Sequence, residues 1–367
     1  MKLLTLLSDP EYSLPLVNNS GLTFVEFLEN KFQKYIYELK NSVDLLDGLN
    51  NILQSHSELI RLTEVLAVEV IEIIKLKKQG YNSESYQRFN SLMSSFNTFF
   101  RTIDSITYLD ATFYRAVNTE GKNPGDLLNQ ARLFHAPFEY STKVGCGRFS
   151  YQGVPFLYLS TNIITSYLET QTNSLNFFQA AKFNNKIPLT VLDFEYRIPT
   201  LVGSTVQYEQ NLQRLALLLP LLISCFATVN EKDIAPDEYI IPQTLCEWMR
   251  NTNIFDGIQY PSTKINGNFK KDFYCIVIPP QTFPKDGKGY CTYLKDNLFH
   301  MSQVCSWEHH QVEINTHFTS TFTAGIQINS QVETLEWNSK VLEYEMTEIG
   351  QMEYYLFSLP SDKITFT

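Results

Sequence analysis

One carboxylate in the middle of the chain is a candidate for glycosidic-bond chemistry. A helical pattern over residues 163–169 puts Glu169 on the side of Asn162 and Thr165, opposite the apolar residues of that stretch. A carboxylate there can stabilise the positive charge that builds on a sugar carbon when a glycosidic bond breaks. The alternative is a solvated helix residue.

Two arginines beside aromatic residues can bind a diphosphate. Arg115 follows Tyr114 and Arg148 precedes Phe149, in a chain whose formal net charge is −10. A guanidinium presents parallel N–H donors that match the oxygens of a pyrophosphate. Ion pairing with a nearby Asp or Glu is the alternative for both.

A tyrosine and a serine near predicted strand ends complete the polar candidates. Tyr158 lies late in an apolar strand, where its ring can stack on a ligand ring or pack in the core. Ser262 follows Pro261, which ends the strand beginning at Gly257. Its hydroxyl can orient a ligand or cap a turn.

Other catalytic patterns do not fit. Gly145–Ser150 begins like a dinucleotide fingerprint but has serine in place of the third glycine, and the sequence has no Walker loop, H-E-x-x-H or G-x-S-x-G motif. Four histidines, His300, His309, His310 and His317, match no metal-ligand spacing, so no metal is expected.

Composition excludes several protein classes. The negative charge disfavours nucleic-acid binding. Six cysteines without a C-x-x-C pair fit reduced thiols in the cytosol. No export signal is recognisable, and the apolar stretch 215–229, interrupted by Pro220, is too short to span a membrane and predicts a buried helix. We expect a cytoplasmic protein.

The elements that carry these residues follow a helical region. Apolar residues recur at three- and four-residue steps over 20–108. Ser20 is predicted to cap the first helix, Gly48 to interrupt the second, Gly80 to end it, and Asn82 to begin a third.

Mixed helices and strands are predicted between residues 110 and 281. The tail from about residue 288, including 312–318, is predicted to form short antiparallel strands. The fold class is therefore α+β. In the middle region the predicted strands are 154–160, 189–194, 257–260 and 273–278, and the predicted helices are 161–169, 207–226 and 243–250.

Five segments in order resemble the RES domain, a family named for its Arg, Glu and Ser. They are Phe113–Ala116, Gly147–Ser150, Phe156–Ser160, Tyr167–Glu169 and Asp256–Ser262. The resemblance implies a fold like that of ADP-ribosyltransferases and an activity directed at NAD. It assigns catalysis to Glu169, Ser262 and Arg115, and NAD binding to Arg115, Arg148, Tyr158, Gln243 and Ser262.

The family resemblance implies an NAD-consuming enzyme that breaks the nicotinamide N-glycosidic bond, with water or phosphate as acceptor. Such enzymes are bacterial toxins or defence effectors, so an antitoxin, immunity or regulatory protein is an expected partner. Residues 263–271 are longer and more basic than in compact RES toxins, which leaves the acceptor open.

Two other functions stay open. One is ADP-ribosyl transfer to a macromolecule. Thr319–Thr321 and Glu343–Glu345 loosely resemble the Ser-Thr-Ser and Glu-x-Glu motifs of some arginine-directed transferases. The other is an inactive binding adaptor, against which the intact Arg115, Glu169 and Ser262 argue.

We predict three domains, which are a helical N-terminal module over 1–108, a catalytic domain over 109–285 and a β-rich C-terminal extension over 286–367. None of the five segments precedes residue 110. The module is therefore expected to fold alone and to regulate or oligomerise the enzyme, and residues 109–367 to retain NAD cleavage.

Overall fold

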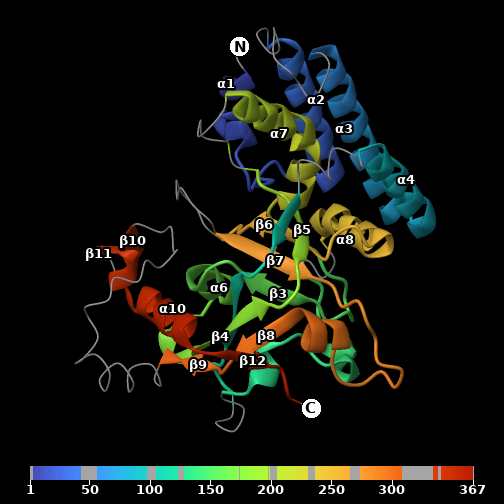
Figure 1. Ribbon diagram of the computed structural model, residues 1–367. Coiled ribbons are helices and arrows are strands. Elements are labelled where there is room, and N and C mark those ends of the chain that lie inside the picture. Colours follow the sequence, from blue (N-terminus) through green and yellow to red (C-terminus); the bar gives the residue numbers. More distant parts are fainter. Residues whose placement is uncertain are drawn as a thin grey trace. The chain divides into compact units, whose positions relative to one another are not determined.

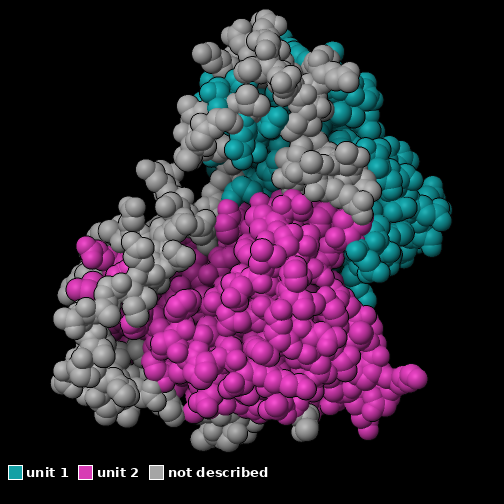
Figure 2. Space-filling model, in the orientation of Figure 1, with its two compact units in different colours: residues 1–104, 146–151, 194–253 teal, residues 105–145, 152–193, 254–367 magenta. Residues whose placement is uncertain are grey.

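The computed structural model forms two compact units, each described here by itself (Figure 1 and Figure 2). The first comprises residues 1–104, 146–151 and 194–253, and the second comprises 105–145, 152–193 and 254–367. The structure describes residues 3–42, 56–96, 105–122, 128–172, 174–196, 198, 205–229, 236–264, 273–307, 334–337 and 340–366.

The first unit is helical. Its helix α7 contains Pro220 and is buried along most of its length, as predicted for that stretch. None of the described helices is long and apolar enough to cross a membrane. The elements are α1 (Leu3–Leu7), η1 (Pro10–Tyr12), α2 (Phe24–Lys40), α3 (His56–Lys78), α4 (Asn82–Ser95), α7 (Thr205–Phe226), η6 (Asp237–Tyr239) and α8 (Ile240–Thr252).

Helix α2 begins later than the sequence predicts. Thr23, not Ser20, is the cap, because Thr23 and Glu26 form a reciprocal capping box. The Ser20 hydroxyl instead donates to the side chain of Asn18. The predicted end of α3 near Gly80 and the start of α4 at Asn82 are confirmed, whereas Gly48 lies outside the described residues.

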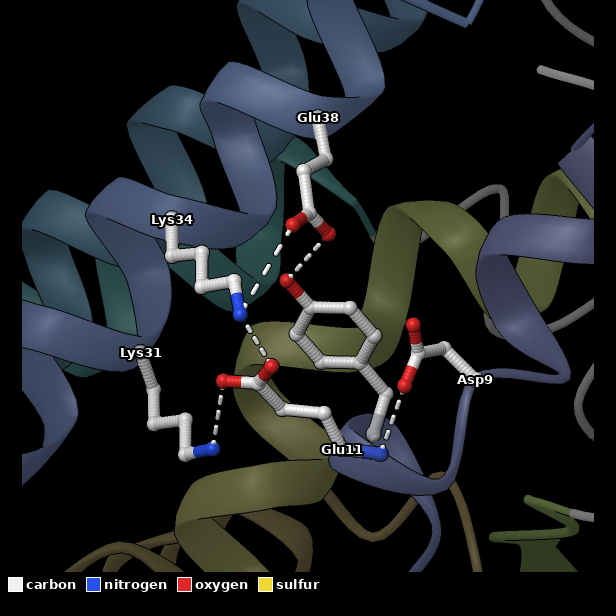
Figure 3. A network of polar contacts seen from close by, with 6 residues as sticks. Asp9, Glu11, Lys31, Lys34 and Glu38 are labelled. Atoms are coloured by element: carbon white, nitrogen blue, oxygen red, sulfur yellow. Dashed lines mark hydrogen bonds and ion pairs between the residues drawn. The ribbon is translucent and has the colours of Figure 1, made fainter.

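A polar network ties η1 to α2 (Figure 3). Glu11 pairs with Lys31 at 3.0 Å and also with Lys34, and the Tyr12 hydroxyl donates to Glu38 at 2.7 Å. These paired groups are partly exposed, so the network fixes geometry more than it adds stability.

Helix α7 supplies core to this unit from a distant part of the sequence. It packs against α3, and the buried Tyr35 hydroxyl of α2 donates to the carbonyl of Ala216 at 2.8 Å. A fragment of residues 1–108 lacks α7 and therefore exposes the surface of α2 and α3 that α7 covers. The division at residues 108 and 285 stays a prediction.

The second unit is built on one large mixed sheet, which confirms the α+β class. The strand order is β1-β5-β6-β7-β3-β2-β4-β8-β12, with β9 beside β4. Its strands are β1 (Ser105–Tyr108), β2 (Thr112–Asn118), β3 (Leu157–Ser160), β4 (Phe178–Asn185), β5 (Leu189–Asp193), β6 (Gly257–Pro261), β7 (Tyr274–Ile278), β8 (Phe299–Ser302), β9 (Cys305–Ser306) and β12 (Ser361–Lys363).

The predicted middle strands and helices are confirmed, but the tail is less strand-rich than expected. It contains helix α10 (Glu348–Ser358) in addition to β8, β9, β12 and the hairpin β10 (Thr334–Trp337) and β11 (Lys340–Glu343). Helix α10 was missed because its short sequence mixes aromatic and β-forming residues. The predicted strand 312–318 lies outside the described residues.

Both faces of the sheet are covered by apolar clusters. One contains Phe113, Leu157 and Ala181. The other contains Tyr114 and Ile163, and it packs helices α6 (Ile163–Thr170) and α10 onto the sheet. Strands β2 and β3 are joined by only one residue pair, Tyr114 with Ser160, whereas all seven residues of β2 pair with β4. The junction of β2 and β3 therefore has the fewest paired residues in the sheet.

Gly257 leads to a stability prediction for this unit. A Cβ there would lie 2.7 Å from the carbonyl oxygen of Val277 on the neighbouring strand. We expect Gly257→Ala to lower the free energy of unfolding by about 1–3 kcal/mol, measured by urea denaturation. Gly145→Ala is the control, because a Cβ at Gly145 meets nothing within 4 Å. Equal stability of the two variants would contradict the prediction.

Candidate active site

Glu169 lies in the last turn of α6. Asn162 caps this helix by accepting from the Thr165 amide at 2.9 Å. The prediction that Asn162 and Thr165 share an outward face with Glu169 is wrong, because both are buried at the capped end. Only the last turn is open, and there Glu169 is exposed.

The structure brings Glu169 and Ser262 together. The Ser262 hydroxyl donates to Glu169 Oε1 at 2.6 Å. Ser262 itself is held at the end of β6, where its amide donates to the carbonyl of Phe273 at 2.8 Å and its Oγ accepts from the Lys264 amide at 3.2 Å. Ser262 thus fixes one carboxylate oxygen of Glu169 while the side chain keeps an exposed surface.

A third residue at this carboxylate was not found from the sequence. The Cys275 thiol of β7 lies 3.5 Å from Glu169 Oε1 and donates to it. Burial, followed by the Glu169 charge, raises the pKa of Cys275 well above its usual value. The thiol therefore stays protonated and acts as a donor. No sequence motif marks it; its place follows from the register that sets Cys275 opposite Ser160 and Tyr260.

Arg115 directs its charge at β3 and forms no ion pair with a described residue. The residue is partly exposed, but its Nε is buried and has no hydrogen-bond partner among the described residues. Nη1 donates to the Tyr158 carbonyl at 3.0 Å. No described carboxylate forms an ion pair with it, so the ion-pair alternative is not what the structure shows. Burial lowers its pKa to about 10, which still leaves it charged at neutral pH.

Arg115 lies where β2 and β3 separate. The pairing of β2 with β3 stops at Tyr114 and Ser160. The Arg115 guanidinium donates to the carbonyl of Tyr158 in place of a β2 amide. Strand alternation places Arg115 on the face of Ala181, its partner on β4, whereas Glu169 comes from the helix on the other face. Hydrogen bonds thus join Arg115 with Tyr158 and Glu169 with Ser262, as two separate pairs.

Arg148 and Gln243 belong to the first unit and lie close together there. Arg148 Nη1 donates to the carbonyls of Cys225 at 2.6 Å and Ala227 at 3.0 Å. The Gln243 side-chain amide donates to the carbonyls of Gly147 at 3.2 Å and Ser150 at 3.0 Å. Gln243 therefore braces the turn that carries Arg148.

The remaining candidates add no site among the described residues. His309, His310, His317 and Thr319–Thr321 lie outside them. In the described part of the chain no group of three or more His, Cys, Asp or Glu is arranged to hold a metal ion. Tyr344, within the triplet 343–345, is buried and donates to Glu353.

Comparison with known proteins matches a family model to the part of the chain that contains Glu169 and Ser262. Residues 122–289 match the family model described as the RES domain, which agrees with the family resemblance predicted from the sequence. The match includes Glu169 and Ser262, and Arg115 precedes it. A relative from Bacillus subtilis (strain 168), named "Putative toxin YopC", is 27% identical over 372 residues, which cover 94% of this chain and 78% of the relative. No solved structure matches the chain significantly.

A neutral histidine lies within the electrostatic reach of Arg115. His135 is fully buried; its Nε2 accepts from the Cys291 amide at 3.0 Å and its Nδ1 donates to the Ala136 carbonyl at 2.8 Å. Burial lowers the pKa of His135 to about 4, and the charge of Arg115 acts in the same direction.

This histidine makes stability depend on pH. Between pH 6.5 and 4 the unfolded chain binds a proton at His135 that the folded protein does not, so folded stability falls as pH falls through this range. We expect His135→Gln to reduce the slope of the free energy of unfolding against pH by up to about 1.4 kcal/mol per pH unit. Urea denaturation between pH 4 and 8 measures it. At pH 8 His135 is neutral in both the folded and the unfolded chain, so the difference in unfolding free energy between variant and wild type at that pH reflects packing alone. A variant with the wild-type slope would show that His135 does not titrate this way.

Proposed function

We propose that the protein consumes NAD by cleaving its nicotinamide N-glycosidic bond, with Glu169 as the carboxylate that meets the reacting ribose. The observation that carries the proposal is the exposed Glu169 carboxylate held by Ser262 within a RES domain. A fixed carboxylate stabilises a charged transition state more than a mobile one does, because the fixed group need not reorganise as charge develops.

The reaction requires charge stabilisation on one side of the sugar. As the bond from ribose C1 to the nicotinamide nitrogen breaks, its electron pair leaves with nicotinamide and positive charge develops on the ribose. Glu169 stabilises that charge. Water then attacks C1 and loses a proton to give ADP-ribose, or phosphate attacks to give a phosphorylated ADP-ribose.

The other candidates bind and orient NAD in this proposal. Arg115 has the unsatisfied Nε and the charge to bind pyrophosphate oxygens. Tyr158, whose carbonyl holds Arg115, offers a ring for stacking on nicotinamide. Arg148 and Gln243 belong to the first unit, and their contact with NAD stays a prediction of the family resemblance.

The biological setting is also proposed. The relative's printed name and the family favour a toxin or defence effector that acts in the cytoplasm. Unrestrained NAD loss harms the cell that makes such an enzyme, so we expect an antitoxin, immunity or regulatory protein. The helical N-terminal region is the proposed site of regulation or of homo-oligomer formation.

One assay distinguishes the possible reactions. The purified chain is incubated with adenine-labelled NAD, with and without phosphate, and the products are separated by chromatography. Nicotinamide with ADP-ribose indicates hydrolysis, and a phosphorylated ADP-ribose indicates phosphorolysis. Label on protein indicates ADP-ribosyl transfer, and unchanged NAD favours the inactive adaptor and contradicts the proposal.

Glu169→Gln tests the carboxylate directly. Glutamine keeps the size of the side chain and an acceptor for Ser262 but removes the charge, so we expect turnover to fall on the order of 10²-fold or more with little change in stability. Glu120→Gln, at an exposed carboxylate in the same unit, should keep wild-type turnover. Near wild-type NAD consumption by Glu169→Gln would refute the assignment.

Arg115→Lys tests pyrophosphate binding. Lysine keeps the charge but loses the paired donors, so we expect NAD affinity to weaken by about 1–3 kcal/mol in calorimetry. Arg61→Lys, at an exposed arginine of α3, is the control for the same substitution. Unchanged NAD binding by Arg115→Lys would assign Arg115 a structural role.

A further inference from the structure

A buried carboxyl on α10 contacts the helix that carries Glu169. Glu353 is 5% exposed, and its Oε2 accepts from the backbone amide of Ile163 at 2.9 Å and from the Tyr344 hydroxyl at 2.5 Å. Helix α10 lies beyond residues 122–289, the part of the chain that matches the family model. The contact therefore joins the matched domain to a segment that the family model does not describe.

The amide that Glu353 binds belongs to the first residue of α6. The first amides of a helix have no acceptor within the helix, and a buried one costs stability if nothing accepts it. Asn162 accepts from Thr165, and Glu353 accepts from Ile163. Both acceptors lie at the buried end of α6, opposite the turn that carries Glu169.

Helix α10 is itself anchored to the sheet. Lys182, a buried lysine of β4, donates to the carbonyl of Phe357 at 2.8 Å and to that of Leu359. These carbonyls lie at the C-terminal end of α10, where a positive charge is favourable. Because Lys182 fixes one end of α10 and Glu353 contacts α6, α10 connects α6 to strand β4 of the sheet.

Resting on the proposed function, in which Glu169 meets the substrate, we propose that Glu353 is a positioning residue that holds α6 in register so that Glu169 reaches the reacting ribose. Helix α6 is short and Glu169 lies six residues beyond Ile163, about 9 Å along the helix at 1.5 Å per residue. A shift at its first turn is therefore transmitted to the carboxylate. Displacements near 1 Å at a reacting group can cost on the order of 10²-fold in rate.

The charge of Glu353 is less important than its acceptor oxygen. Burial raises the pKa of Glu353 to about 7, whereas the hydrogen bonds from Tyr344 and Ile163 act in the opposite direction. A neutral side chain with an oxygen at the same place can therefore replace it. This separates Glu353 from Glu169, whose negative charge the reaction uses.

The test compares three substitutions in the full chain. Glu353→Leu removes the acceptor, and we expect kcat to fall about 10- to 100-fold with KM for NAD changed less than about threefold. Glu353→Gln retains the acceptor and should restore kcat to within about twofold of wild type. The control is Glu120→Leu, at an exposed residue of the same unit, which should have wild-type kcat.

A second measurement does not depend on activity. Hydrogen exchange of the peptide covering 162–170 should become at least about tenfold faster in Glu353→Leu and stay as in wild type in Glu353→Gln and Glu120→Leu. If Glu353→Leu does not fold, Glu353→Asp replaces it, because its shorter side chain withdraws the acceptor from Ile163 and should speed exchange and lower kcat in the same way.

The outcomes separate this proposal from the proposed function. Wild-type kcat and wild-type exchange in Glu353→Leu or Glu353→Asp would overturn the positioning role. A loss of kcat in Glu353→Gln equal to that in Glu353→Leu would also overturn it, since the acceptor would then not be what matters. If wild-type protein does not cleave NAD, the proposed function fails, and the exchange measurement still decides whether Glu353 holds α6.

Discussion

The anchoring of α6 at both ends is the constraint on which the candidate site depends. This helix is short, and a short helix has little stability of its own. Its first amides are taken by Asn162 and Glu353, and its last turn is tied to β6 through Glu169 and Ser262. Glu169 therefore owes its position to strands and helices that are far from it in the sequence.

Much of the fold could be predicted from the sequence because its signals are local. Apolar periodicity located the helices within residues 20–96, and a continuous apolar run located β3. The error at Ser20 is instructive, since Ser20 and Thr23 are both good caps by residue type. Only the reciprocal bond with Glu26 decides between them.

The site was predictable in part for a similar reason. Motif order identified Glu169, Ser262 and Arg115, but neither Cys275 nor Glu353 lies in a motif. Both reach α6 through pairing or packing between distant segments, which spacing along the chain does not encode. The absence of a described carboxylate near Arg115 likewise required coordinates, because the sequence offers many acidic residues.

The position of β12 has a consequence for synthesis of the chain. Strand β8 pairs on one side with β4 and on the other with β12, but β12 follows β9 by more than fifty residues. A ribosome adding about 5–20 residues per second exposes the free edge of β8 for several seconds before β12 emerges. Unpaired strand edges bind other strands, so intermolecular pairing through β8 is a hazard in the interval before β12 pairs.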